Sequence, residues 1–406
     1  MVQDLALQRN KYKHLSDEEW RWFLQQVEGR ERTADKLPTF AAIDDWWYPV
    51  RLSCEQCSSE ATARYKASLC QRSGLSAERS VSETVCQSAG RSLLDLTGGY
   101  GVDTYFLSEQ FDHTDYVEQN AELCRIAAHN FQRPTPTLPK GKEIYVHNTT
   151  AEEFLKDHLS AISNHLYDLI FLDPARRDSY GGKVFRLEDC TPNVVELLPA
   201  LLTHGKRIMI KLSPMLDITQ AVTTLSQVTW DIYVVAIKNE VKEVLLMSGG
   251  AGQITAIDLS KKEQAFTFTR EEESVSEAVC QSEGRSVLCQ TQSVYLYEPN
   301  AAILKAGAYK LVAQRFGLQK LDINTHLYCS EELVADFPGR VWKVKEPTPT
   351  LPKGKEIKQA NVLVRNYPLT AEQLKKKLHL RDGGTAYVIG CRVAGKPTVI
   401  LAERLQ

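Results

Sequence analysis

The chain has 406 residues, of which 43% are hydrophobic and 25% are charged. These proportions are ordinary for a soluble globular protein, and the length predicts about two to four domains. They exclude a chain that is disordered throughout, a collagen-like chain and a disulfide-stabilised mini-protein. No apolar run approaches the roughly 20 residues that span a bilayer, so we expect no membrane segment and no membrane partner.

The net charge of −2 conceals an asymmetry along the chain. Residues 339–406 contain 14 Lys and Arg against 5 Asp and Glu, a net charge of +9, whereas the remaining 338 residues carry −11. A basic terminal domain on an acidic body is typical of a protein that binds a phosphate backbone. The alternative is a solvated helix face, since Lys375, Lys376 and Lys377 are consecutive.

The cysteines and the N-terminus indicate where the protein works. Ten cysteines are scattered without a disulfide framework, and residues 1–13 are polar, without an apolar signal segment. Both features predict a cytoplasmic protein. Cys54 and Cys57 form the only tight pair, and no second Cys or His pair lies at zinc-finger spacing, so we expect no metal site.

The first half of the chain changes from helices to alternating elements. Residues 1–88 are predicted to be helical, and Ser16 and Glu19 have the spacing of a capping box ahead of an apolar run. From 91 to 250, apolar strand-like runs alternate with helical segments. That alternation predicts the βαβ arrangement of a parallel sheet.

From residue 251 onward the pattern differs again. Short strand-like runs accompany two helical stretches, at about 300–316 and 370–379. This combination indicates small α+β modules.

Two sequence words occur twice. An identical run of eleven residues occupies 134–144 and 347–357, and a second word occupies 80–92 and 274–286. Because the surrounding sequence does not align, we interpret the words as inserted sequence. The proline spacing of the first word excludes helix and central strand. We therefore expect four exposed loops or linkers, with a proline-rich docking motif as the alternative.

The stretch from Leu93 to Asp103 is the most informative one. It reads Leu-Leu-Asp-Leu-Thr-Gly-Gly-Tyr-Gly-Val-Asp, so an apolar strand enters a glycine-rich turn, and a helix follows at Thr104. The glycines let the backbone approach a ligand closely, and a helix N-terminus offers free N–H groups. The pattern predicts a nucleotide-binding loop; the alternative is an ordinary strand-to-helix turn.

Two acids follow the next strands. Glu118 ends a strand 17 residues after Gly101, where doubly wound folds place a carboxylate that accepts both ribose hydroxyls. The alternative for Glu118 is an ordinary surface acid. Asp173 follows the apolar run at 167–172, which predicts that it lies at the carboxyl edge of the sheet, with Pro174 fixing the turn.

These motifs together resemble those of class I S-adenosylmethionine-dependent methyltransferases. The resemblance covers roughly 91–250 and includes Asp-Leu-Thr-Gly-Gly-Tyr-Gly-Val-Asp, Val-Glu-Gln-Asn, Asp-Pro-Ala-Arg and Ala127-Ala-His-Asn130. Residues 232–247 look like the closing antiparallel hairpin of that fold. More narrowly, the chain resembles a bacterial family of these enzymes with a C-terminal THUMP-like domain, through the segments 361–370 and 383–390, and a ferredoxin-like module, through Tyr297-Glu-Pro-Asn-Ala-Ala-Ile-Leu-Lys.

The resemblance implies an α/β fold, a Rossmann-like class I methyltransferase domain flanked by smaller parts. The expected organisation is an N-terminal helical domain (1–88), the methyltransferase domain (89–250), a ferredoxin-like module with an inserted linker (251–335) and a THUMP-like domain (336–406).

The resemblance also implies S-adenosylmethionine as the cofactor, and a role for each matching residue. The catalytic group would be Asp173, Pro174, Ala175 and Arg176. The cofactor-binding group would be Asp95, Thr97, Gly98, Gly99, Gly101, Asp103, Glu118, Thr150 and Asp173, with Glu118 on the ribose.

Differences from related enzymes narrow the expected chemistry. Asp-Pro-Pro-Tyr enzymes methylate amino groups, but this turn has Ala175 and Arg176 in place of Pro and Tyr, so no aromatic ring stacks on a target base. The turn is closer to the Asp-Pro-Pro-Arg of some RNA methyltransferases.

Enzymes that methylate pyrimidine carbon 5 place a cysteine after the fifth strand, and 208–215 has none. Cys190 lies in an apparent helix start and is interpreted as a buried apolar residue.

The leading hypothesis is a methyltransferase that acts on structured RNA, ribosomal or transfer RNA, with RNA held by the basic C-terminal domain. One alternative is a small-molecule or protein methyltransferase. Another is a noncatalytic RNA-binding protein that retains a nucleotide pocket, and a third is a dinucleotide oxidoreductase.

Overall fold

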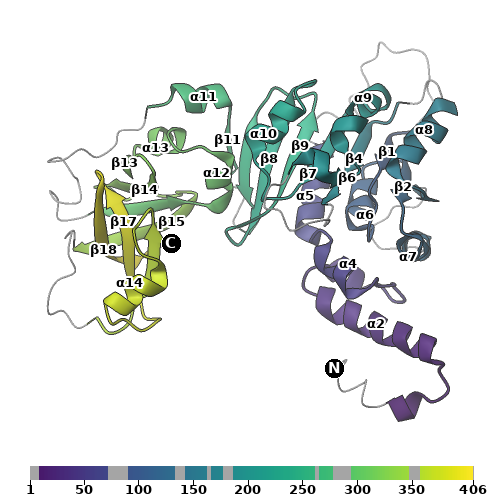
Figure 1. Cartoon of the computed structure of the whole chain (residues 1–406), viewed down its shortest axis with the longest axis horizontal. Coiled ribbons are helices and arrows are strands. Elements are labelled where there is room, and N and C mark those ends of the chain that lie inside the picture. Colours follow the sequence, from purple (N-terminus) through teal and green to yellow (C-terminus); the bar gives the residue numbers. More distant parts are fainter. Residues whose placement is uncertain are drawn as a thin grey trace. The chain divides into compact units, whose positions relative to one another are not determined.

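The computed structural model describes residues 9–71, 90–132, 142–161, 166–176, 186–260, 265–277, 294–346 and 357–405 (Figure 1). It divides into two compact units, Met1–Trp230 with Leu245–Gly250, and Asp231–Val244 with Ala251–Gln406. Most of each repeated word lies outside the described residues, so the loops expected there stay predictions.

The elements follow one another in the order that the sequence predicts, helices first and then alternating strands and helices. Up to residue 224 they are η1 (Arg9–Tyr12), α2 (Asp17–Thr33), α3 (Pro38–Ala41), α4 (Arg51–Gln56), α5 (Glu60–Cys70), β1 (Ser92–Asp95), α6 (Val102–Ser108), β2 (His113–Glu118), α7 (Ala121–Phe131), β3 (Glu143–Asn148), α8 (Ala151–Ala161), β4 (Leu169–Leu172), β5 (Ala175–Arg176), η3 (Leu187–Asp189), β6 (Cys190–Thr191), α9 (Val194–His204), β7 (Ile208–Leu212) and α10 (Ile218–Thr224). The later ones are β8 (Trp230–Ile237), β9 (Glu240–Ser248), β10 (Ile254–Asp258), β11 (Phe266–Phe268), α11 (Arg270–Val275), β12 (Tyr295–Pro299), α12 (Ala301–Ala306), α13 (Leu311–Phe316), β13 (Gln319–Asp322), β14 (Thr325–Ser330), β15 (Gly339–Glu346), β16 (Asn361–Arg365), α14 (Ala371–Lys377), β17 (Ala386–Val393) and β18 (Lys396–Arg404).

A nine-stranded sheet has the order β11-β10-β8-β9-β7-β4-β1-β2-β3. The strands β3, β2, β1, β4 and β7 are paired in parallel. The central strand β4 is Leu-Ile-Phe-Leu and is buried throughout, as expected of a strand covered on both faces. The parallel sheet predicted from the alternation is therefore confirmed, and the carboxyl ends of β1, β2 and β4 meet at one edge.

The hairpin expected at 232–247 is formed by β8 and β9. Lys238 and Asn239 connect the strands and both have positive φ, 52° and 62°. A two-residue turn with this backbone matches the twist of the strands that it joins. Lys at the first position is unusual, and the backbone N–H of Asn239 is held at 2.7 Å by the Asp258 carboxylate.

The N-terminal helices pack on the sheet unit through a shared core. The capping box of α2 is confirmed: the Ser16 hydroxyl accepts from Glu19 N at 3.2 Å, and the Glu19 carboxylate accepts from Ser16 N at 2.7 Å. Buried side chains of the first helices, such as Phe40 and Trp46, pack in one cluster with Tyr105 and Phe106 of α6.

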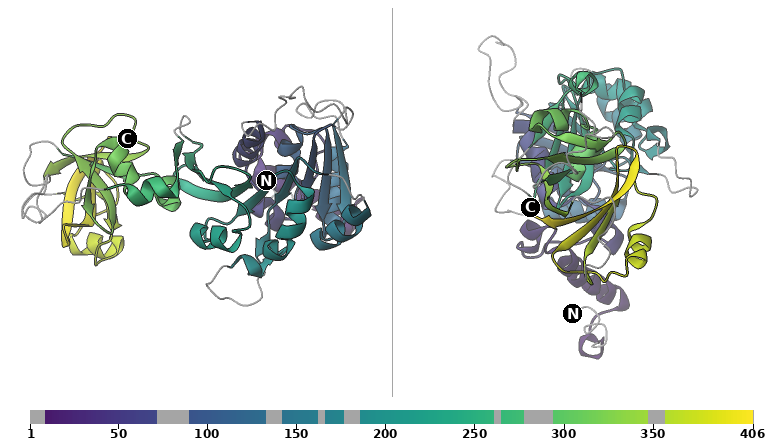
Figure 2. Two further views of the ribbon diagram at one scale, coloured as in Figure 1. Left: turned by 90° about the horizontal axis from the view of Figure 1, so that it is seen from above. Right: turned by 90° about the vertical axis from the view of Figure 1, so that its left-hand side faces the viewer.

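A second sheet of seven strands has the order β13-β14-β12-β15-β18-β17-β16. Its core contains the fully buried Trp342 packed among residues of β12, β14, β17 and β18. Helix α14 covers one face of this sheet (Figure 2). Its buried Leu374 packs with Val388 and Leu401. The helix expected at 370–379 is confirmed, but the stretch expected at 300–316 is two helices, because Gly307 ends α12 with φ of +86°.

One local prediction is wrong. Cys190 begins the short strand β6, which pairs antiparallel with β5, and the helix α9 starts only at Val194. The interpretation of its side chain holds, since Cys190 is 3% exposed.

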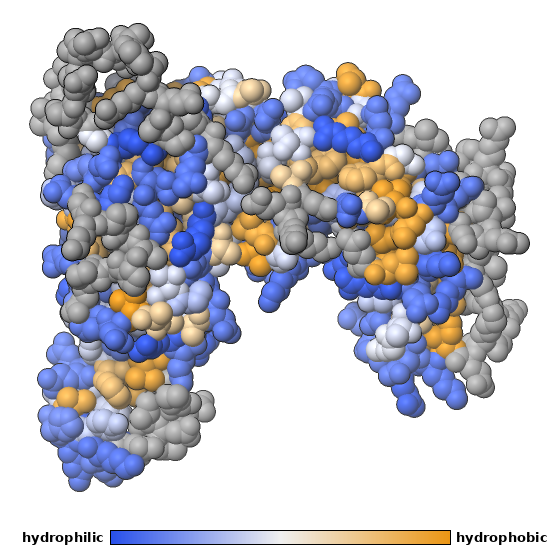
Figure 3. All heavy atoms as spheres, turned by 180° about the vertical axis from the view of Figure 1, so that it is seen from behind, coloured by the Kyte–Doolittle hydropathy of each residue, from blue (hydrophilic) through white to orange (hydrophobic). Residues whose placement is uncertain are grey.

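The surface is mixed in character. On the face drawn in Figure 3, hydrophobic residues form separate patches among hydrophilic ones. No helix within the described part of the chain is both long and apolar enough to cross a bilayer.

Candidate cofactor and active site

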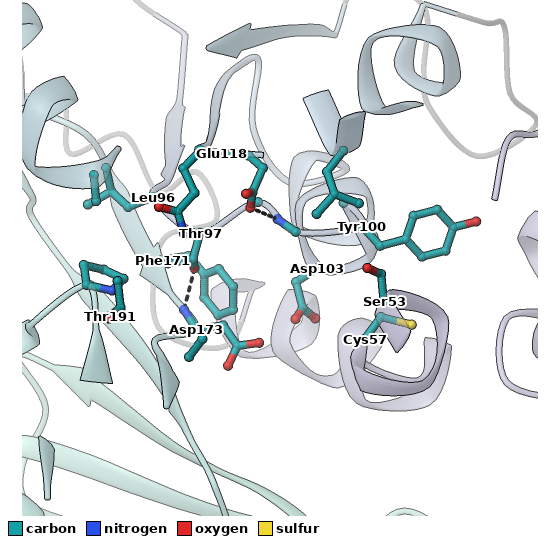
Figure 4. Close-up of a pocket in the computed structure, with 18 of the residues that line it drawn as sticks. Ser53, Cys57, Leu96, Thr97, Tyr100, Asp103, Glu118, Phe171, Asp173 and Thr191 are labelled. Carbon is teal, nitrogen blue, oxygen red and sulfur yellow. Dashed lines mark hydrogen bonds between the residues drawn. The ribbon is translucent and has the colours of Figure 1, made fainter. Parts of the chain in front are cut away.

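A cavity of about 290 Å³ lies at the carboxyl edge of the parallel strands (Figure 4). The loop after β1, the end of β2, the start of α8 and the turn after β4 all contribute to its wall, as does the N-terminal helix α4. Its lining residues are Ser53, Gln56, Cys57, Ser58, Leu96, Thr97, Gly98, Gly99, Tyr100, Gly101, Val102, Asp103, Glu118, Gln119, Leu123, Thr149, Thr150, Ala151, Glu152, Phe171, Asp173, Ala175, Thr191 and Pro192.

Three glycines shape the loop after β1. A Cβ added to Gly98 would lie 2.1 Å from the ring of Tyr116, and one added to Gly101 would lie 2.6 Å from the ring of Phe131. Gly99 and Gly101 have positive φ, 55° and 83°. The hydroxyl of Tyr116 donates to Gly99 O at 2.6 Å. The loop is thus a close-packed turn: Gly98 and Gly101 leave no room for a side chain, and the positive φ of Gly99 and Gly101 favours glycine.

Glu118 is held against this loop from the end of β2. One carboxylate oxygen accepts from Gly99 N at 2.9 Å, and the other accepts from Asn120 N at 2.7 Å (Figure 4). Each oxygen keeps a further lone pair, so the carboxylate can still accept a hydrogen bond from a ligand. The geometry suits the predicted ribose contact, which stays a prediction.

Asp173 stands at the opposite side of the cavity, beyond β4. Its backbone N–H donates to the Thr97 hydroxyl at 2.6 Å, which joins the turn after β4 to the glycine loop (Figure 4). The Asp173 side chain is 39% exposed, and its carboxylate forms an ion pair with the Lys211 ammonium. The predicted catalytic turn and the predicted cofactor loop are therefore fixed to each other.

Asp95 lies below the cavity and does not contribute to its wall. The side chain is 1% exposed and accepts from Thr97 N at 3.0 Å and from the Thr104 hydroxyl at 2.6 Å. Burial raises the pKa of Asp95 from 3.8 to about 7, although both hydrogen bonds act in the opposite direction. In this geometry Asp95 supports the loop from beneath.

Asp103 does line the cavity, but its carboxylate is engaged by protein groups. The Ser58 hydroxyl donates to it at 2.6 Å, Lys66 Nζ lies at 3.1 Å and Lys211 Nζ at 3.5 Å. Burial raises the pKa of this carboxyl, but the two lysines and Ser58 outweigh the effect and lower it below 3.8. Asp103 is thus the centre of a buried ionic cluster.

The remaining predicted residues differ in how the structure places them. Thr150 lines the cavity, and its hydroxyl accepts from Glu153 N at 3.2 Å at the start of α8. Ala175 is exposed and lines the cavity, whereas Pro174 is partly buried and does not. Arg176 belongs to β5, and Arg177 lies outside the described residues.

The N-terminal helices and two buried lysines contribute to the site without having been predicted from the sequence. Ser53, Gln56, Cys57 and Ser58 form part of the wall, and burial raises the pKa of the Cys57 thiol. A charge at position 211, inside the apolar run Ile-Met-Ile-Lys-Leu, was a readable signal, but Lys66 has no such pattern around it.

Across the described ranges, no three His, Cys, Asp or Glu side chains come together as a metal site would require. The seven cysteines of this part of the chain are free thiols.

Comparison with known proteins identifies the C-terminal modules. Residues 295–338 match the model of a ferredoxin-like domain, and residues 339–404 match that of a THUMP domain-like module. No curated protein matches the chain.

Among solved structures, a protein from Porphyromonas gingivalis W83 described as a proposed methyltransferase is 30% identical, with a TM-score of 0.80, over 97% of this chain and 92% of that one. A SAM-dependent methyltransferase from Agrobacterium tumefaciens is 13% identical over 45% of this chain and 61% of that one, with a TM-score of 0.33. A proposed methyltransferase from Streptococcus mutans, solved in complex with SAH, is 12% identical over 39% of this chain and 88% of that one, with a TM-score of 0.28.

The similarity to the Porphyromonas gingivalis protein extends over nearly the whole length of both chains. Together with the strand order of the large sheet and the two C-terminal modules, it confirms the expected fold. The chain belongs to the bacterial family of class I S-adenosylmethionine-dependent methyltransferases that carry a ferredoxin-like module and a C-terminal THUMP-like domain.

Proposed function

We propose that the protein is an S-adenosylmethionine-dependent methyltransferase that acts on structured RNA in the cytoplasm. The observation that carries this proposal is the cavity in which Glu118 and Asp173 stand on opposite sides of one glycine-rich loop. A nucleoside bound to Glu118 through its ribose would extend along the loop toward Asp173, where the acceptor has to approach.

The residues present fit S-adenosylmethionine. Glu118 offers free lone pairs for ribose hydroxyls, and the close-packed glycines leave the backbone accessible from the cavity. Leu123, Ala151 and Phe171 supply apolar wall for a planar base. When bound, S-adenosylmethionine supplies an electrophilic methyl group. Thr97, Gly98, Gly99, Gly101, Asp103 and Thr150 would hold the cofactor with Glu118, and Asp95 would act on it through the loop.

We assign the acceptor side to the turn after β4. Asp173 presents a partly exposed carboxylate to the cavity, and Ala175 leaves space beside it because its side chain is small. Pro174 keeps the turn rigid. Arg176 is proposed to meet a phosphate of the substrate. Positioning of an acceptor in line with the methyl group is the main requirement of this reaction.

The choice of RNA rests on the C-terminal part. Residues 339–406 carry a net charge of +9, and Lys376 and Lys377 are exposed at the end of α14. A THUMP-like module occupies the same residues.

The domain boundaries at residues 88, 250 and 335 are also proposals.

The test is a comparison of total RNA from cells with and without the gene. Nucleosides from ribosomal and transfer RNA are separated and quantified by mass spectrometry. We expect one methylated nucleoside to disappear from the cells without the gene and to return with the wild-type gene but not with Asp173→Ala. Identical nucleoside profiles would contradict the proposal and favour a small-molecule or protein substrate.

A further inference from the structure

Asp103 and Asp173, two carboxylates that line the cavity, belong to a network of alternating charges whose two lysines do not line it. Lys66, which is fully buried in α5, lies 3.1 Å from Asp103. Lys211, at the carboxyl end of β7, lies 3.5 Å from the same carboxylate and also forms an ion pair with Asp173. Ser58 donates to Asp103 at 2.6 Å and accepts from Lys211 at 3.0 Å.

The last two members of this network differ in exposure, and of the two only Asp173 lines the cavity. The Lys211 side chain is 13% exposed, whereas the Asp173 side chain is 39% exposed. The Lys211 ammonium donates a hydrogen bond to Oδ2 of Asp173. The other carboxylate oxygen of Asp173 can accept a hydrogen bond from the methyl acceptor. An acceptor bound in this way would lie beside a carboxylate and close to the Lys211 ammonium group.

This pair of charges discriminates between kinds of acceptor. When a neutral amino nitrogen takes up a methyl group, positive charge develops on it, and an ammonium group nearby opposes that charge. When a hydroxyl oxygen takes up a methyl group, it must lose its proton and pass through a partly anionic state. A carboxylate that accepts the proton and a neighbouring ammonium that stabilises the oxygen both favour this second reaction.

We propose that the methyl acceptor is a hydroxyl oxygen, namely a ribose 2′-hydroxyl of RNA; the inference rests on the RNA methyltransferase activity proposed above. The acceptor oxygen forms the new C–O bond as the bond between methyl carbon and sulfur breaks. The sulfonium becomes a neutral thioether, and the hydroxyl proton passes to the free oxygen of Asp173 and then to water. Asp173 is the catalytic residue, and Lys211 is a positioning residue that holds its carboxylate.

The first experiment locates the methyl group chemically. Total RNA from cells lacking the gene is incubated with the protein and tritiated S-adenosylmethionine and then hydrolysed in alkali. Alkaline cleavage needs a free 2′-hydroxyl, so a 2′-O-methyl group leaves its label in alkali-stable dinucleotides, whereas a base methyl group leaves it in mononucleotides. We expect label in dinucleotides only.

The two failures are distinguishable. Label in mononucleotides overturns this inference and leaves the RNA methyltransferase function standing. RNA that takes up no label, from a protein that binds S-adenosylmethionine in calorimetry, overturns both.

The second experiment tests Lys211 against a matched control. Lys206 lies at the other end of β7 and pairs with Asp168 at 2.9 Å on the surface. Lys211→Met should lower kcat about 100-fold, the effect of removing one such stabilising group. Lys211→Arg keeps the cation and should recover most of the lost kcat. Lys206→Met should leave kcat unchanged.

Measurements other than activity separate this role from a merely structural one. The dissociation constant of S-adenosylhomocysteine should stay close to wild type in all three variants. The melting temperature should fall in Lys211→Met, where Asp103 loses one of its two cations, but not in Lys206→Met. A kcat of Lys211→Arg as low as that of Lys211→Met would overturn the positioning role, and a normal kcat of Lys211→Met would overturn it as well.

Discussion

Gly98 and Gly99 are adjacent in the cofactor loop but meet different constraints. A Cβ at Gly98 would penetrate the ring of Tyr116, which is fully buried and cannot move aside. A Cβ at Gly99 would meet only Thr97 O at 3.8 Å, so the cost there is that of the positive φ alone. Gly98→Ala should therefore destabilise the protein by about 1–3 kcal/mol, the range of overpacked cores. Gly99→Ala should cost about 1 kcal/mol.

Chemical denaturation of the two variants measures this difference. Equal destabilisation by both substitutions would contradict the close packing of Gly98 on Tyr116.

Asp115 is the centre of a second polar cluster, apart from the cavity. It accepts hydrogen bonds at 2.7 Å from His113, from His147 and from the hydroxyl of Tyr167. Burial raises the pKa of Asp115, but these hydrogen bonds outweigh it and hold the pKa well below 3.8. The hydrogen bond to Asp115 raises the pKa of His113 above 6.5.

These shifts define a pH window of stability. The lowered pKa of Asp115 contributes stability above about pH 3.8, which is lost as the pH falls toward the folded-state value. The raised pKa of His113 contributes stability below about pH 6.5, which is lost as the pH rises through the folded-state value. Asp115→Asn should therefore destabilise most between these limits, measured as melting temperature against pH. A difference from wild type that is constant with pH would contradict this account.

At the residue scale, the sequence predicted those side chains whose position is determined by the end of a strand. Glu118 and Asp173 could be expected because each lies at the end of a predicted strand, and parallel strands bring such ends to one edge. Lys66 could not, because its partner Asp103 is distant in sequence and meets it only through packing of α5 on α6. Asp95 resembles a ligand residue in the motif, yet its burial makes it a support of the loop.

At the scale of elements, the segment before α4 is attached to α7 by one side chain. The buried amide of Asn130 accepts from Trp47 N at 2.9 Å and donates to Trp47 O at 3.0 Å. His129 stacks on the Trp47 ring with centroids 3.6 Å apart, and Arg125 lies over the same ring. The segment is thus docked through both its backbone and its side chain.

Asn130→Leu keeps the volume but removes both hydrogen bonds. The N–H of Trp47 would lose its partner, whereas its carbonyl keeps the hydroxyl of Tyr100 at 3.3 Å. We expect the free energy of unfolding to fall by about 1–3 kcal/mol in urea denaturation, the cost of one buried group without a partner. A loss below about 0.5 kcal/mol, the size of an ordinary surface substitution, would show that the docking of this segment is not part of the cooperative fold.

The sequence predicted the existence of most elements better than their ends. Buried apolar strands such as β4 and the hairpin of β8 and β9 carry their own signals, in composition and in spacing. The break at Gly307 and the short strand β6 do not, because a left-handed glycine inside a helical pattern and a two-residue strand depend on the surrounding packing.

At the scale of the whole molecule, the two C-terminal modules are one structure. β12 of the ferredoxin-like module pairs antiparallel with β15 of the THUMP-like module, and Trp342 packs in a core with Leu296 and Leu327. The sequence suggests separate modules because each has its own motif. The shared sheet could not be read from them, since pairing between distant strands leaves no local pattern.

The basic character of 339–406 is tested by charge reversal. Lys375 pairs with Asp382 at 2.6 Å, whereas Lys376 and Lys377 are exposed. Changing all three to Glu should weaken RNA binding and reduce the slope of log K against log salt by about 0.7 for each RNA phosphate that a lysine no longer neutralises. Lys156→Glu, an exposed change on α8, serves as the control and should leave the slope unchanged. If the slope of log K against log salt is the same in the triple variant as in the wild type, these lysines form only a solvated surface.

The central claim is that the cavity binds S-adenosylmethionine through Glu118, and isothermal titration calorimetry tests it most directly. We predict saturable binding to one site by the wild-type protein. Glu118→Ala should weaken it by about 10- to 150-fold, as expected for the loss of charge-assisted hydrogen bonds worth about 1.5–3 kcal/mol. Glu122→Ala, which removes an exposed acid paired with Arg125, should bind like wild type. An unchanged dissociation constant in Glu118→Ala would remove Glu118 from the site, and a wild-type protein that does not bind S-adenosylmethionine would contradict the account as a whole.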